Sequence, residues 1–174
     1  MAEPSARLRS GLALAAPALA LLAGVVLLSL PLRLFQGALP TPVLPLLVVF
    51  LYALYDPGAL PAPVIFAGGL LHDLLTGAAL GPWASVYLLV AVMIGAQRTY
   101  FLGRARDVVW VGFAGVSVAA MIVYWAEMSL LKGGFLPLRP AAYQFLVTVL
   151  SYPLAARAFF WLRARVGVRE AWEA

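Results

Sequence analysis

Long apolar runs, separated by short polar breaks, make up nearly the whole chain. Four runs hold about 20 residues or more, enough for a helix to cross a bilayer core of about 30 Å; they lie at 11–32, 82–101, 108–131 and 141–161. Two further runs, 42–55 and 61–75, reach only about 21–23 Å as helices. The pattern therefore predicts an all-α, polytopic membrane helix bundle with six spans.

The second and third spans of this bundle are short, and their form is open. Prolines crowd their starts, and Asp56-Pro57-Gly58 between them is a turn signal. The two runs could form thin or tilted spans, or a re-entrant hairpin buried in protein. Either form returns the chain to the same side of the membrane.

Composition supports an integral membrane protein with a single domain over residues 1–174. The chain is 64% hydrophobic, 11% charged and has a mean hydropathy of +0.98, whereas soluble domains are about half apolar. The net charge of +5 does not indicate nucleic-acid binding, because the chain has no basic soluble module. Since cysteine is absent, disulfides and thiolate chemistry are excluded.

The basic residues predict that both chain ends are cytoplasmic. With six spans, three basic residues fall on the outer side: Arg33, Lys132 and Arg139. Nine fall on the inner side: Arg7, Arg9, Arg98, Arg104, Arg106, Arg157, Arg163, Arg165 and Arg169. This positive-inside bias makes residues 1–10 a cytoplasmic N-terminus and 163–174 a cytoplasmic basic tail, with Arg157 one turn from the inner end of the last span.

The stretch 68–82, GGLLHDLLTGAALGP, places polar residues inside an apolar run. A buried carboxylate needs a partner, because an unpaired charge in hydrocarbon is costly. Four residues share one helix face with helical spacing: Gly69, Asp73, Thr76 and Gly77. Gly77, Gly81 and Pro82 are expected to end this helix and begin the next.

Catalytic constellations are missing from the sequence. The single histidine, His72, rules out a His pair for zinc, and no Walker loop or GxGxxG is present. Only Asp73 and Glu127 among the acidic residues lie well inside apolar runs, so they are candidate functional residues. Fold-specifying packing is the favoured role for both. Their depth also predicts an ionic cluster at the outer boundary with three basic residues: Arg33, Lys132 and Arg139.

The same stretch carries a resemblance to a known family. Its pattern is formed by Gly69, Leu70, Leu71, Asp73, Leu74, Leu75, Thr76, Gly77 and Gly81. It resembles the signature of MreD, the bacterial rod shape-determining membrane protein family, and chain length and hydrophobic layout agree over nearly the whole sequence. Thr76 stands where serine is more usual, and the pattern assigns no role to His72.

The resemblance implies a non-enzymatic scaffold or regulator of cell elongation and lateral peptidoglycan synthesis in the bacterial cytoplasmic membrane, with no cofactor. It implies an MreC-like single-span partner, together with an MreB-like filament, a RodA glycosyltransferase and a class B penicillin-binding protein. Membrane lipid is the other expected partner. One alternative is a small-molecule-binding membrane subunit of a vitamin or metal importer. Another is a membrane enzyme using Asp73 and His72.

The glycines of the stretch also suggest where the partner binds. Gly68, Gly69 and Gly77 would offer a shallow surface on which a second helix can come close. We therefore expect the partner's span to dock near the outer half of the bundle, beside Asp73 and Glu127.

Overall fold

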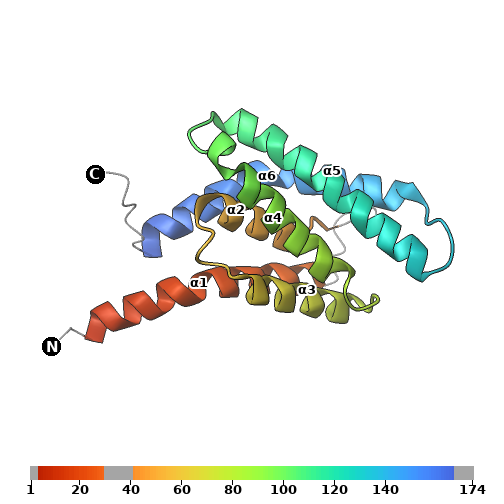
Figure 1. Ribbon diagram of the computed structural model, residues 1–174. Helices are drawn as coiled ribbons and strands as arrows, with labels where there is room; N and C mark the ends of the chain where they lie inside the picture. The colour runs from red at the N-terminus through yellow and green to blue at the C-terminus, as the bar shows by residue number, and fades with distance from the viewer. Residues whose placement is uncertain (1–3, 30–40, 167–174) are drawn as a thin grey trace.

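The computed structural model describes residues 4–29 and 41–166, with side chains for 15–28 and 41–165. Helices joined by short turns make up this part of the chain and it contains no strand, which confirms the predicted all-α class there. Its six helices are α1 (Pro4–Ser29), α2 (Leu44–Tyr55), α3 (Ala62–Thr76), α4 (Pro82–Phe101), α5 (Arg106–Leu131) and α6 (Leu138–Val166) (Figure 1).

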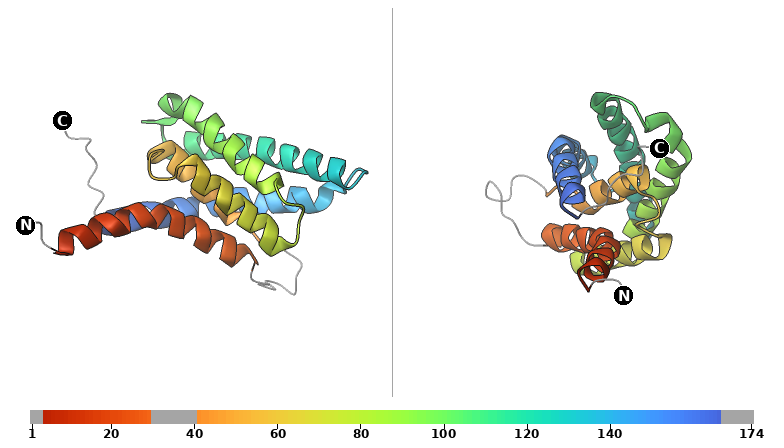
Figure 2. Two further views of the ribbon diagram at one scale, coloured as in Figure 1. Left: turned by 60° about the horizontal axis from the view of Figure 1, so that its bottom comes forward. Right: turned by 90° about the vertical axis from the view of Figure 1, so that its left-hand side faces the viewer.

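Successive helices run in opposite directions, so the connections alternate between two ends of the bundle (Figure 1 and Figure 2). One end holds the α2–α3 and α4–α5 connections and the last turns of α6. We call it the arginine-rich end, after Arg98, Arg104, Arg106, Arg163 and Arg165. The opposite end, which holds the α3–α4 and α5–α6 connections, is called the hairpin end.

Two contacts fix the end of α2 at the arginine-rich end. The Arg98 Nε group donates a hydrogen bond of 2.9 Å to the carbonyl of Leu54, and Arg163 forms an ion pair of 3.8 Å with Asp56. The last turns of α4 and α6 therefore hold the turn after α2. Consequently the α2–α3 connection lies beside the last turns of α4 and α6.

The short helix α2 lies at the centre of the molecule, in contact with α1, α4 and α6. Its sequence, LPLLVVFLYALY, is apolar on every side, as expected for a helix surrounded by protein. Phe50 packs edge-on against Phe113 of α5 at 5.0 Å and against Tyr152 of α6 at 6.0 Å between ring centroids. These rings join three helices into one core.

Among the residues described with side chains, three helices are long and apolar enough to cross a membrane: α4, α5 and α6. The outward faces of α5 and α6 are strongly apolar, with Val111, Leu150 and Leu154 each about 70% exposed or more. An apolar surface of this kind suits lipid, not water. The described part of α1, α2 and α3 form shorter apolar helices. The chain is therefore a membrane protein.

The last helix is longer than the sequence predicts. It ends at Val166, not near Trp161, so Arg157 lies nine residues before its end, or about 14 Å at 1.5 Å per residue. The end of the helix is thus more than one turn from Arg157, whereas its distance from the inner end of the membrane span stays a prediction. Arg33 and residues 167–174 lie outside the described residues.

Candidate functional site

Asp73 connects α3 to the start of α4. Its side chain is completely buried, and its two oxygens accept hydrogen bonds from the backbone N–H groups of Gly81, at 2.8 Å, and Trp83, at 3.2 Å. These donors belong to the first turn of α4, whose N–H groups have no partner within the helix. The partial positive charge of the helix N-terminus also stabilises a carboxylate. Asp73 thus caps α4 from a neighbouring helix.

Gly69 lies one turn before Asp73 and brings the two helices together. A Cβ added at Gly69 would lie 2.6 Å from the backbone nitrogen of Ala84 and closer still to its Cα. Real Cβ atoms do not approach backbone so closely, and only glycine permits this contact. The short distance between α3 and α4 at Gly69 is what allows the Asp73 side chain to reach the N-terminus of α4.

The turn between these helices is built from two glycines with positive φ. Gly77 has a φ of 66° and ends α3, and Gly81 has a φ of 119° directly before α4. The N–H of Ala78 reaches back to the carbonyl of Asp73 at 3.0 Å, a bond that closes many helix C-termini. The predicted helix end at Gly77 and helix start at Pro82 are confirmed.

Thr76 differs from the other signature residues. Its side chain is exposed, and its hydroxyl donates to the carbonyl of His72 at 2.8 Å within the same helix. Serine could make the same bond. Gly69, Asp73, Gly77 and Gly81 therefore meet in one structural unit, whereas the Thr76 side chain bonds only within its own helix. We call this unit, residues 69–84, the α3–α4 hairpin.

The structure leaves no free surface at the paired glycines. A Cβ at Gly68 would lie 2.5 Å from the Leu21 side chain of α1, and Gly69 meets Ala84 of α4. Both glycines are buried by helices of the same chain. Of the predicted docking surface, Gly68 and Gly69 are therefore not available, because they serve packing within the bundle, whereas nothing lies within 4 Å of a Cβ added at Gly77. The partner itself stays a prediction.

His72 has a defined role that the sequence did not reveal. It is 2% exposed, and its Nδ1 atom lies 2.6 Å from the hydroxyl of Tyr87. Its ring stacks on Trp83 at 4.6 Å, and Trp83 in turn stacks on Tyr124 of α5 at 4.3 Å. The spacing of Trp83 and Tyr87, four residues apart on one helix face, was the available signal. The sequence alone could not show that His72 contacts these two residues, because the contact depends on how α3 packs against α4.

Glu127 joins α5 to the same region. Both of its carboxylate oxygens lie 2.9 Å from the hydroxyl of Ser85, in the first turn of α4. Within residues 41–165 no ion pair forms at the hairpin end, and Lys132 and Arg139 are exposed there. The predicted ionic cluster is therefore not found among the described residues, because Asp73 uses backbone donors and Glu127 uses a hydroxyl. Arg33 lies outside the described residues.

A cavity of about 340 Å³ lies beside the α3–α4 hairpin. It is lined in part by His72, Thr76, Trp83, Tyr124, Lys132 and Gln144. These groups can hydrogen-bond to a small polar molecule and stack on it. Within the described side chains, no three His, Cys, Asp or Glu residues are placed to hold a metal ion.

Thr148, a further polar candidate for a solute site, is used in packing. Its hydroxyl accepts from the buried N–H of Val43, just before α2, at 3.0 Å and donates to the carbonyl of Gln144 at 2.7 Å. It satisfies a backbone donor that would otherwise be buried without a partner.

Comparisons of the chain with protein-family models, with curated proteins and with solved structures found no match.

Proposed function

We propose that this protein is a non-enzymatic, MreD-like scaffold of the cell-elongation machinery in the bacterial cytoplasmic membrane. The proposal rests on the observation that the signature residues together build the α3–α4 hairpin. Gly69, Asp73, Gly77 and Gly81 each have a specific task in the α3–α4 hairpin. A signature that builds a helix hairpin suits a protein whose activity is to present a fixed shape to partners.

The proposed topology has six membrane crossings with both termini in the cytoplasm. The alternating helix directions and the position of the α2–α3 connection at the arginine-rich end support it. The arginine-rich end then faces the cytoplasm, in agreement with the positive-inside rule. The hairpin end faces the periplasm.

The proposed main partner is an MreC-like protein with a single span, and its docking face must lie away from the paired glycines. The exposed apolar faces of α5 and α6 offer room for another helix. Through such a partner the chain would act on a RodA glycosyltransferase and a class B penicillin-binding protein outside, and on an MreB-like filament inside. The short connections of the chain suit this indirect role.

The proposal is tested in the source bacterium by replacing the chromosomal gene. Loss of the protein should turn rods into round cells and reduce recovery of an MreC-like protein with the remaining complex. Gly69→Ala should reproduce this loss, because its Cβ overlaps Ala84. Gly95→Ala is the matched control, since nothing lies within 4 Å of its added Cβ. Rods that persist without the protein would contradict the proposal.

A second function, a solute-binding subunit of a vitamin or metal importer, is favoured by the cavity beside His72. Trp83 lines it, so a bound vitamin should change tryptophan fluorescence of the purified protein. Lys132→Ala should weaken such binding, whereas Arg139→Ala, which is outside the cavity, should not. No fluorescence or thermal response across a panel of vitamins and divalent metals would dismiss this candidate.

A further inference from the structure

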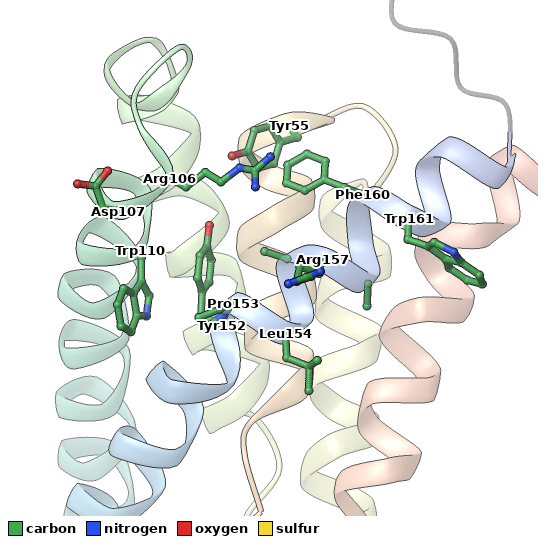
Figure 3. Close-up of a pocket in the computed structure, with 12 residues that line it drawn as sticks. Tyr55, Arg106, Asp107, Trp110, Tyr152, Pro153, Leu154, Arg157, Phe160 and Trp161 are labelled. Atoms are coloured by element: carbon green, nitrogen blue, oxygen red, sulfur yellow. The ribbon is translucent and has the colours of Figure 1, made fainter.

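A large cavity lies at the other end of the molecule from the α3–α4 hairpin. It has a volume of about 860 Å³ and opens between α5 and α6 near the arginine-rich end (Figure 3). Most of its wall is apolar and aromatic, including Trp110, Tyr152, Leu154, Phe160 and Trp161. None of the signature residues contributes to it.

A proline shapes the wall of this cavity. Pro153 lies inside α6 and has no N–H, so the carbonyl of Val149, four residues earlier, loses its helix partner. The indole N–H of Trp110 on α5 donates to that carbonyl at 2.9 Å. Trp110 is thereby fixed against α6, and its ring forms a rigid side of the cavity.

Two arginines supply positive charge to these apolar walls. Arg106 begins α5 and Arg157 lies in α6, and both line the cavity. Within residues 41–165 neither guanidinium has an ion-pair or hydrogen-bond partner. Asp107 also lines the cavity, but its carboxylate points away from Arg157 at the outer edge (Figure 3). The cavity therefore has a net positive charge.

The surroundings of Arg157 make its charge significant. Its side chain is exposed on α6 between two exposed apolar residues, Leu154 and Phe160. A cation on an apolar surface that suits lipid is costly unless it snorkels or meets an anion. Arg106 approaches the same space from the helix end, so an anion held between the two arginines would satisfy both.

We propose that this cavity binds one anionic phospholipid of the membrane leaflet at the arginine-rich end. The lipid phosphate lies between Arg106 and Arg157, where guanidinium groups can donate paired hydrogen bonds to it. An acyl chain lies along the apolar wall formed by Leu154 and Trp161. The positive charge of the cavity favours an anionic headgroup, and its apolar walls favour an acyl chain. Basic pockets between membrane helices bind such lipids in general. The inference is independent of the proposed scaffold function.

The test measures the thermal stability of the purified full chain in a neutral detergent. Phosphatidylglycerol should raise the unfolding temperature more than phosphatidylcholine, with a saturable dose response. The double variant Arg106→Gln/Arg157→Gln should need at least tenfold more phosphatidylglycerol for half the effect. Arg139→Gln is the matched control, because it removes an exposed arginine at the hairpin end and should leave the response unchanged.

Two further measurements, with glycerol phosphate and with a truncated chain, identify the source of the anion. Glycerol phosphate, which has the headgroup chemistry without chains, should not stabilise the protein at the same concentrations. A response to glycerol phosphate equal to that of the lipid would overturn the proposal in favour of a soluble anion. Equal responses to both lipids, or an unchanged response in the double variant, would also overturn it. Loss of the response after truncation of the chain at Val166 would overturn it as well, because the lipid would then bind to residues 167–174.

Discussion

At the residue scale, the two buried polar residues of α3 have protein partners that explain their burial. Asp73 accepts hydrogen bonds from two backbone N–H groups, and His72 shares a hydrogen bond with the Tyr87 hydroxyl. Buried polar groups are retained when they are hydrogen-bonded, and removing one partner costs more than the bond itself. This accounts for a histidine and an aspartate in a membrane helix without any catalytic step.

Replacement of Asp73 should show this capping role directly. Asp73→Asn keeps one carbonyl oxygen and can accept one of the two bonds, whereas Asp73→Leu accepts neither. We expect a loss of about 1 kcal/mol for Asn and about 2–4 kcal/mol for Leu, from the lost cap and the buried N–H groups. Unfolding in detergent, followed by circular dichroism, measures both. Equal losses for Asn and Leu would show that the negative charge matters more than the geometry of the two bonds.

Sequence reasoning predicted part of this site for physical reasons. Gly77 and Gly81 carry a local signal, because helix ends and turns demand conformations that glycine favours. A buried Asp73 also signals that a partner must exist. The identity of the partner could not be predicted, because the N-terminus of α4 reaches Asp73 only through the contact between Gly69 and Ala84. The stacking of His72 on Trp83 likewise depends on how two helices are placed.

At the element scale, the apolar runs of the sequence predict where the helices lie better than where they end. Apolar periodicity located every helix, but it placed the end of α6 five residues early, at Trp161 in place of Val166. Arg163 and Arg165 caused this error, because charged residues signal the end of a span although a helix can continue beyond the membrane. The central position of α2 was also not predicted, since a short apolar run suits a thin span and a buried helix equally.

The bond between Trp110 and α6 should be coupled to Pro153. Trp110→Phe removes the indole donor, and we expect it to cost about 1 kcal/mol while Pro153 is present. In a Pro153→Ala background the new N–H at residue 153 can satisfy Val149, so the same change should cost less. A double-mutant cycle on unfolding free energies measures the coupling. Additive effects would show that Val149 does not depend on Trp110.

At the scale of the whole molecule, the chain is a bundle whose two ends differ in chemistry. The hairpin end holds Asp73, Glu127 and the polar cavity beside His72, and the arginine-rich end holds the apolar cavity lined by Arg106 and Arg157. The proposed partner contacts, the leaflet of the lipid and the periplasmic position of the α3–α4 hairpin all depend on six crossings. In a re-entrant arrangement the α2–α3 connection would instead lie within the membrane.

Labelling of a cysteine at Gly58 tests this arrangement most directly. Gly58 lies exposed in the α2–α3 connection, nothing lies within 4 Å of an added Cβ there, and the native chain has no cysteine. Ala79, exposed in the α3–α4 turn, provides the matched control on the other side. Six crossings predict that a membrane-impermeant maleimide labels Ala79→Cys in intact cells and labels Gly58→Cys only after the membrane is opened. Labelling of Gly58→Cys in intact cells, or its protection from maleimide under both conditions, would contradict the account.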